Sequence, residues 1–221
     1  MIRIGILIAL QVNNWNFERA ERKREVKYLR NIMLDMEKDI ARLDFLIQFR
    51  KERMHGDGLS IDHMNGEPVT DLDQLSKNIV NSLMEHRFTP NNSTFTELAS
   101  SGNLSLISND SIKVLLLALN ELHKANQFAA DHEAHDYREY ISKQLFLHVN
   151  LDRILPVYTG QSTAAAQGIS VTDFRQILGS REYKNGLFIL TIMSSSFIPA
   201  FEEMQAQSRK IIEMIQAELT E

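Results

Sequence analysis

A long segment near the start of the chain, with regularly spaced apolar residues, constrains the fold most. The segment from Phe17 to Met54 contains neither glycine nor proline and is rich in strong helix-forming residues. This composition and the heptad-like spacing predict a helix that packs along its length against another helix, as in a coiled coil. Extra apolar residues such as Phe45 and Phe49 favour burial in a bundle. The spaced apolar positions, three or four residues apart, are Val26, Leu29, Met33, Met36, Ile40, Leu43 and Ile47.

The rest of the chain predicts an all-α fold. Only nine of the 221 residues are glycine and four are proline, which disfavours a turn-rich β fold. We predict an elongated helical bundle built on three long helices, about 14–54, 109–150 and 181–219, with shorter helices between them. His55–Gly58 is predicted to end the first long helix. Asn65-Gly66 is predicted to close a small hairpin between 59–62 and 68–70.

Local signals predict the shorter elements. Asp71 or Asp73 is expected to cap a helix over about 72–87, and Ser93 with Glu97 to cap a short helix ending near Gly102. Residues 156–170 are predicted to be a loop, and residues 172–178 a short helix.

Two features of the long helices carry further predictions. Residues 112–122 are apolar on nearly every face, which predicts a central, buried position. Pro199 predicts a kink or break near 194–198 in the last helix. After it, an apolar stripe is expected to pack antiparallel to the first helix, with Ser208 as a polar exception. The stripe consists of Phe201, Met204, Ile211 and Ile215.

The first residues suggest a helix that leaves a membrane. An apolar run from Ile4 to Leu10 gives way to a polar segment that contains Trp15, the only tryptophan, and aromatic residues of this kind mark the headgroup level. The run has seven residues, whereas a complete span needs about 20. It is therefore either an N-terminal helix or strand packed in the core, or the end of a span whose upstream part is absent from this sequence.

Two stretches resemble a known family. The sequence Gly-Ile-Leu-Ile-Ala-Leu-Gln-Val-Asn-Asn-Trp-Asn at 5–16, followed by the charged segment 18–30, resembles a family of bacterial single-pass membrane proteins of unknown function. Residues 95–98 and 101–110 are similar to that family's middle motif. The resemblance implies a basic N-terminus, one transmembrane helix and then a helical domain. Residues 1–16 would be the membrane-proximal segment and 17–221 a single bundle domain. Phe17 stands where the family usually has an acidic residue.

A cluster of basic residues follows the apolar run. Its cations, mixed with Glu18, Glu21 and Glu25, indicate either proximity to anionic headgroups or a salt-bridged helix face. The positive-inside rule applied to this cluster alone favours a cytoplasmic domain, whereas the resemblance implies a competing basic segment upstream. We favour an extracytoplasmic domain at the bacterial inner membrane. The basic residues are Arg19, Arg22, Lys23, Arg24, Lys27 and Arg30.

A histidine-rich patch is the strongest candidate for chemistry. His132 and His135 are three residues apart on one predicted helix face and, with His123, suggest a metal site. The spacing differs from the His-Glu-x-x-His motif of zinc proteases. A solvated polar face is therefore the preferred interpretation, as it is for the acidic pairs Glu21/Glu25 and Glu37/Asp39. The carboxylates near the histidines are Asp131, Glu133 and Asp136.

Composition and motifs leave a non-enzymatic function as the leading hypothesis. The chain has no cysteine and a net charge of −5, which disfavour thiol chemistry and nucleic-acid binding. No catalytic, cofactor-binding or metal-binding residue is assigned. We expect a membrane-anchored helical domain that binds or senses a partner, with the lipid bilayer, a protein partner or a second copy as partners. The alternatives are a metal-dependent helical enzyme using residues 123–136, and a soluble oligomer in which Ile4–Leu10 packs between subunits.

Overall fold

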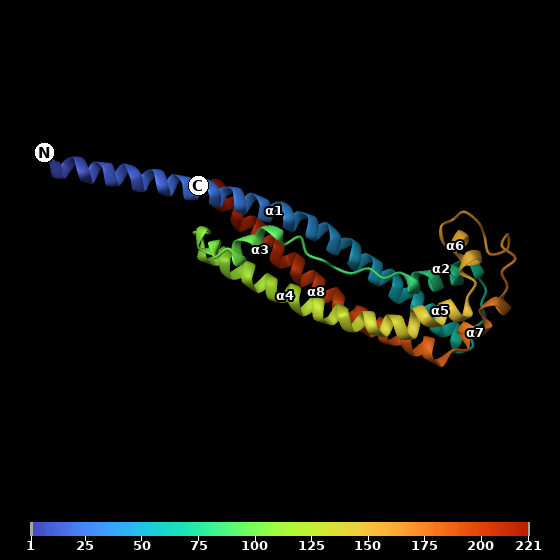
Figure 1. The fold of residues 1–221 in the computed structure, drawn as a ribbon. Coiled ribbons are helices and arrows are strands. Elements are labelled where there is room, and N and C mark those ends of the chain that lie inside the picture. The colour runs from blue at the N-terminus through green and yellow to red at the C-terminus, as the bar shows by residue number, and fades with distance from the viewer. Residues whose placement is uncertain (1, 221) are drawn as a thin grey trace. The chain divides into compact units, whose positions relative to one another are not determined.

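The protein is an all-α helical bundle. The computed structural model describes the backbone of residues 2–220 and the side chains of residues 10–220, and no strand occurs within that range. The predicted fold class is thus confirmed (Figure 1). The α-helices are α1 (Ile2–Met64), α2 (Leu72–Leu83), α3 (Ser93–Ser100), α4 (Asp110–Asp136), α5 (Lys143–His148), α6 (Leu151–Tyr158), α7 (Arg175–Leu178) and α8 (Arg181–Thr220). Two 3-10 helices, η1 (Asn103–Leu106) and η3 (Val171–Phe174), and a π-helical segment, η2 (Tyr137–Ser142), complete the elements.

The chain divides into two compact units, and the three longest helical runs contribute to both. Unit 1 contains the residues up to 42, 90–123 and those from 203 onward. Unit 2 contains residues 43–89 and 124–202. The expected boundary between residues 16 and 17 stays a prediction, and α1 continues through it without a break.

Helix α1 is longer than predicted, and the predicted hairpin is wrong. Gly56 and Gly58 lie inside α1, which ends at Met64, and Gly66 with a φ of 112° follows it. A Cβ atom on Gly56 would lie 2.9 Å from Asn78 Oδ1 of α2. Gly56 therefore allows two helices of unit 2 to approach closely, and it does not end the first one.

The buried face of α1 also differs from the predicted stripe. Leu29, Met36 and Leu43 belong to both, and Ile47 is buried as predicted, whereas Val26, Met33 and Ile40 are only half-buried. Glu25 and Asp39, which were predicted to be solvated, are only 3% and 4% exposed, so that prediction is wrong. The buried series, at alternating intervals of three and four residues, is Glu25, Leu29, Ile32, Met36, Asp39, Leu43, Leu46, Arg50, Arg53, Asp57 and Ser60.

In unit 1, the first part of α1 packs against the start of α4 and the end of α8. Gln205 Nε2 donates to the Ile40 carbonyl at 3.0 Å, and Arg22 Nη1 donates to Glu218 at 3.0 Å. From residue 22 to residue 40 of α1, the partner on α8 moves back from residue 218 to residue 205. This order confirms the antiparallel pairing. The predicted stripe on α8, including Ser208, is buried. The prediction of burial on every face of 112–122 is wrong, because Val114 and Leu117 are exposed.

In unit 2, helix α8 passes through Pro199 without a break, so a break is wrong, whereas a kink stays a prediction. Proline removes one intrahelical hydrogen bond, but Phe197 and Phe201 on either side are buried. The rest of the unit 2 core joins α2, η2, α5, α6, α7 and α8, with these residues among its members: Leu75, Ile79, Ile141, Leu145, Ile154, Phe174, Tyr183 and Leu187.

The shorter elements follow the predictions with local differences. The Asp71 side chain caps α2, accepting from the Gln74 amide at 2.9 Å, but α2 ends at Leu83. Ser93 does not cap α3, because the cap position is Asn92 and its side chain makes no capping hydrogen bond. The predicted 109–150 helix is α4, η2 and α5 in succession, and residues 156–158 of the predicted loop belong to α6.

Candidate functional site

The start of α1 has an exposed surface with large apolar side chains. Residues 10–20 are all exposed, although they form three turns of helix. Leu10, Val12, Trp15 and Phe17 are each more than half exposed, and the Arg19 guanidinium lies 5.5 Å from the centre of the Trp15 ring. The side chains of the apolar run Ile4–Leu10 before Leu10 itself lie outside the described residues. A surface helix usually buries its apolar residues on one face. The large apolar side chains of this segment are instead exposed, and burying them against an apolar partner would be favourable.

A network of charged hydrogen bonds joins α1 to the ends of two other helices directly after this exposed segment. Arg22 donates to Glu25 at 2.7 Å and to the Glu218 carboxylate and carbonyl at 3.0 and 2.9 Å. Glu25 accepts from the Ser108 amide and hydroxyl at 2.6 and 2.7 Å. Asn109 donates to Glu218 at 3.1 Å. We call these five residues the polar clasp.

The polar clasp keeps a buried carboxylate ionised. Burial raises the pKa of Glu25, but the hydrogen bonds from Ser108 and Arg22 outweigh it and leave the pKa below its ordinary value. A buried carboxylate with several donors is stabilised in its charged form. The polar clasp therefore holds α1 firmly where it enters the bundle of unit 1.

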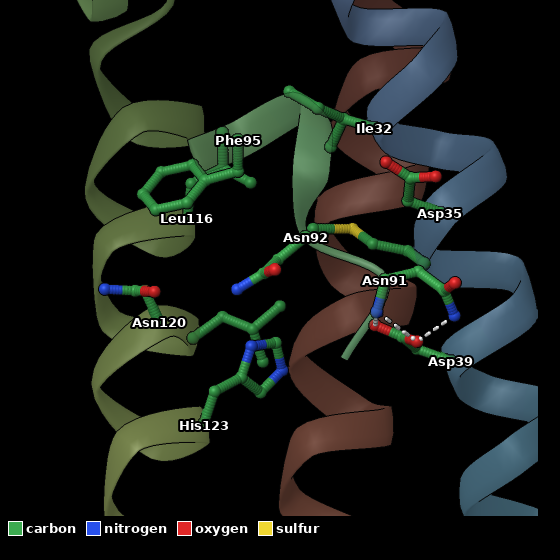
Figure 2. A pocket seen from close by; sticks show the side chains of 11 residues that line it. Ile32, Asp35, Asp39, Asn91, Asn92, Phe95, Leu116, Asn120 and His123 are labelled. Carbon is green, nitrogen blue, oxygen red and sulfur yellow. Dashed lines mark hydrogen bonds between the residues drawn. The ribbon is translucent and has the colours of Figure 1, made fainter. Parts of the chain in front are cut away.

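A small polar cavity lies deeper in unit 1 (Figure 2). Its volume is about 30 Å³, enough for one or two water molecules. Known ligand pockets measure about 300–1,000 Å³, so the cavity does not fit a substrate of ordinary size. Six polar and five apolar residues line it: Ile32, Asp35, Met36, Asp39, Asn91, Asn92, Phe95, Leu116, Leu119, Asn120 and His123.

Hydrogen bonds from Asn91, just before α3, and from Thr94, in its first turn, hold the two carboxylates of the cavity. Asn91 donates to Asp39 through its backbone amide at 2.9 Å and its side-chain amide at 2.7 Å, as Figure 2 shows. Thr94 donates to Asp35 at 2.7 Å. Burial raises the pKa of Asp39 despite the hydrogen bonds from Asn91. Burial also lowers the pKa of His123 to about 4, so its imidazole is neutral at neutral pH.

The three histidines do not come together as the metal site that was considered as an alternative. His123 lies in the cavity of unit 1, whereas His132 and His135 are exposed on unit 2. His132 makes an edge-on contact with Phe128, and His135 Nδ1 lies 3.2 Å from Asp136 Oδ1. Within residues 10–220, no group of three or more histidine or carboxylate side chains is arranged to hold a metal. The solvated interpretation is confirmed for His132 and His135.

Glu133, from the same stretch, is buried in a charged cluster that the sequence analysis did not predict. Its carboxylate accepts from Arg50 at 2.8 and 2.7 Å and from Arg53 at 3.0 Å. Both arginines also donate to Ser194, at 3.2 and 2.9 Å. The Arg50 guanidinium lies 4.1 Å from the Phe197 ring centre. One feature of the sequence could have indicated that both arginines are buried. The alternating spacing of three and four residues between the buried positions of α1 continues from Leu43 and Leu46 to Arg50 and Arg53.

Asp57 continues the same series and is 1% exposed. Its Oδ2 has no hydrogen-bond partner, and burial raises its pKa to about 7 although the nearby charge of Arg53 lowers it. An unpartnered buried carboxyl is costly in its charged form. Asp57 is therefore a site of stored electrostatic strain in unit 2.

The fold and these polar features define an all-α bundle protein. The chain belongs to a family of unknown function, DUF6090, whose model matches residues 1–141. No curated protein and no solved structure matches the chain. That the family is bacterial and membrane-bound stays a prediction.

One of the described helices has the length and composition to cross a membrane. It is α8, whose most apolar window is 33% buried. The core helix of a soluble protein meets the same criterion, so this finding supports membrane association only weakly.

Proposed function

We propose that this protein is a membrane-anchored helical domain that binds or senses a partner and catalyses no reaction. The observation that carries the proposal is the exposed segment 10–20 of α1, with its four large apolar side chains. Burying such side chains is favourable by about 1.5–3 kcal/mol each. A bilayer with its headgroup layer at Trp15 would satisfy them, since tryptophan favours that depth.

The polar clasp supports the idea of an anchor that is mechanically joined to the domain. Arg22 and Glu25 follow Phe17 by five and eight residues. They bind Glu218, near the end of α8, and Ser108, just before α4. An anchoring helix that continued into a loosely attached domain would not need these bonds. We place the protein in the bacterial inner membrane, with the bundle on the extracytoplasmic side, as the family resemblance implies.

The anchor is tested by fractionation of cells that produce the full chain. We expect the protein in the membrane fraction after alkaline carbonate extraction. Replacing Leu10, Val12 and Phe17 by glutamine should release it, because the apolar contact is lost. The matched control replaces the exposed apolar residues Leu34, Val114 and Leu117, which lie elsewhere on unit 1. Recovery of the unaltered protein wholly in the soluble fraction would show that the anchor does not exist.

The orientation has its own test, because the natural chain has no cysteine. A single Lys77→Cys variant carries one thiol at an exposed position of α2. Labelling of intact cells with a membrane-impermeant maleimide is expected. Labelling that occurs only after lysis would mean that the domain is cytoplasmic.

A soluble oligomer is the second candidate, favoured by exposed apolar residues on unit 2. Phe146, Leu147 and Phe188 are exposed there, and exposed apolar patches mark interaction sites. In this case the start of α1 would pack between subunits. Light scattering on purified protein distinguishes the soluble oligomer from the membrane anchor. A lipid-free, soluble dimer or larger species supports the oligomer, and a monomer argues against it.

A further inference from the structure

We propose that one face of α1 binds the anionic headgroup surface of the bilayer; this inference rests on the proposed membrane anchoring. The basic face consists of Lys23, Arg24, Lys27 and Arg30. These four exposed side chains line one shallow depression on the surface of α1. The depression lies away from the buried series that starts with Glu25 and Leu29.

The carboxylates of the same helix do not neutralise the basic face. Glu25 is buried and accepts from Ser108 and Arg22, so its charge is directed into unit 1. Arg22 in turn is held by Glu218. No salt bridge joins any of the four cations of the basic face to a carboxylate within residues 10–220. Of the salt-bridged helix face considered from the sequence, only the Arg22–Glu25 pair forms among residues 10–220, and the four positive charges of the basic face remain directed to the outside.

The basic face is continuous with the exposed apolar segment. Lys23 follows Trp15 by about 12 Å along the helix axis and Lys27 by about 18 Å, at about 1.5 Å per residue. Electrostatic attraction at physiological salt falls off over about 8–10 Å, and the long side chains extend that reach. Arg19, whose guanidinium lies over the Trp15 ring, adds a positive charge between Trp15 and Lys23. Lys23 and Arg24 are thus nearest to the headgroups, and Arg30 is the farthest.

An anionic lipid surface fits this arrangement better than an acidic protein. The positive charges begin just after the apolar side chains, and a bilayer offers both an apolar interior and, directly outside it, a layer of phosphate groups. Basic residues next to a membrane segment gain affinity for such a layer in this way. The chain as a whole has a net charge of −5. Its overall charge therefore repels anions, and any attraction to anionic lipid must come from the local basic face.

The test is sedimentation of the full chain with vesicles of phosphatidylcholine alone or mixed with phosphatidylglycerol. We expect tighter binding to the mixed vesicles, weakened by salt. The variant Lys23→Gln, Arg24→Gln, Lys27→Gln should lose this preference, with affinity for mixed vesicles falling at least tenfold, since each cation near the surface, here Lys23 and Arg24, contributes about fivefold. The control variant Lys38→Gln, Lys77→Gln, Arg209→Gln removes the same charge from exposed positions elsewhere and should bind like the natural chain.

The two vesicle types separate this inference from the proposed anchor. Equal binding to both kinds of vesicle overturns the basic-face proposal and leaves the anchor intact. Equal losses in the two triple variants overturn it as well, because any charge would then suffice. Binding to neither vesicle removes the anchor and this proposal together. If the basic-face variant instead changes self-association in light scattering, an acidic surface of a second copy covers the face, and the lipid proposal is wrong.

Discussion

Arg50 and Glu133 form a two-bonded ion pair in the interior of unit 2, with N–O distances of 2.8 and 2.7 Å. Arg53 and Ser194 complete the cluster, so each carboxylate oxygen of Glu133 has a charged donor. Burial raises the pKa of Glu133, and the two arginines outweigh that effect and lower it below its ordinary value. The pair is therefore ionised at neutral pH.

Removing one partner of this cluster should be severe. Glu133→Ala leaves two buried guanidinium groups without an anion, and we expect a loss of about 3–5 kcal/mol in the free energy of unfolding. Urea denaturation measures it. The control is Lys51→Ala, because Lys51 and Glu202 form a pair at 3.8 Å in which both side chains are largely exposed. That change should cost at most about 1 kcal/mol. Similar losses in both variants would contradict the assigned role of the cluster.

Two glycines inside helices should respond in opposite ways to alanine. A Cβ atom on Gly186 of α8 would lie 2.8 Å from Tyr140 Cβ and 3.0 Å from the Tyr140 carbonyl oxygen, so Gly186→Ala should cost about 1–3 kcal/mol. Gly58 of α1 has no neighbour within 4 Å of that position, so Gly58→Ala should stabilise the protein by about 0.5–1 kcal/mol. Thermal unfolding of the two variants checks this. Destabilisation by Gly58→Ala would show that the helix is not regular there.

Asp57 should make stability fall as the pH rises. Its pKa is about 7 in the folded protein against an ordinary 3.8. Between these values the folded state holds a proton that the unfolded state has released, so the free energy of unfolding decreases with pH and levels off above about 7. Asp57→Asn should remove this slope and stabilise the protein at pH 8, by about 4 kcal/mol at most. Asp62→Asn, at an exposed position of the same helix, is the control. An unchanged pH profile in the Asp57 variant would refute the assignment.

His123 should produce the opposite slope. Its pKa is about 4 in the folded protein, below the ordinary 6.5. Between these values the unfolded state binds a proton that the folded state does not, so stability increases as the pH rises through this window. NMR titration of the imidazole measures the pKa directly, and His123→Gln should flatten the slope. A normal His123 titration would mean that the cavity is open to solvent.

The sequence predicted the class of fold and the three long helical runs because helix propensity and apolar spacing act locally. It placed the buried face of α1 only in part, since Glu25 and Asp39 have the composition of a solvated face. Their partners, Ser108 and Asn91, are far away in the sequence, and spacing alone carries no information about such pairs. The same reason hid the Arg50–Glu133 cluster.

The residues that line the cavity could not be predicted from the sequence either. The cavity joins Asp35 and Asp39 of α1 to Asn91 and His123, and only tertiary packing brings these segments together. In the sequence His123 stands out because of its neighbours His132 and His135, whereas in the fold it lines a cavity together with asparagine, aspartate and apolar side chains. Glycine was the other source of error. A glycine in a helical pattern commonly indicates that the helix ends. Gly56 instead lies inside α1, where the missing side chain allows close packing against α2.

The polar residues in the buried series of α1 restrict how its neighbours can align with it. A helix that buries only leucine can slide by seven residues and meet the same surroundings. If α1 slid by seven residues, Leu43 would take the place of Arg50, and Glu133 would face an aliphatic side chain. Leaving a buried charge unmatched costs about 3–5 kcal/mol, comparable with a large share of the stability of a whole domain. The helices of unit 2 therefore have one permitted alignment, and insertions or deletions of a full heptad in this part of α1 should not be tolerated.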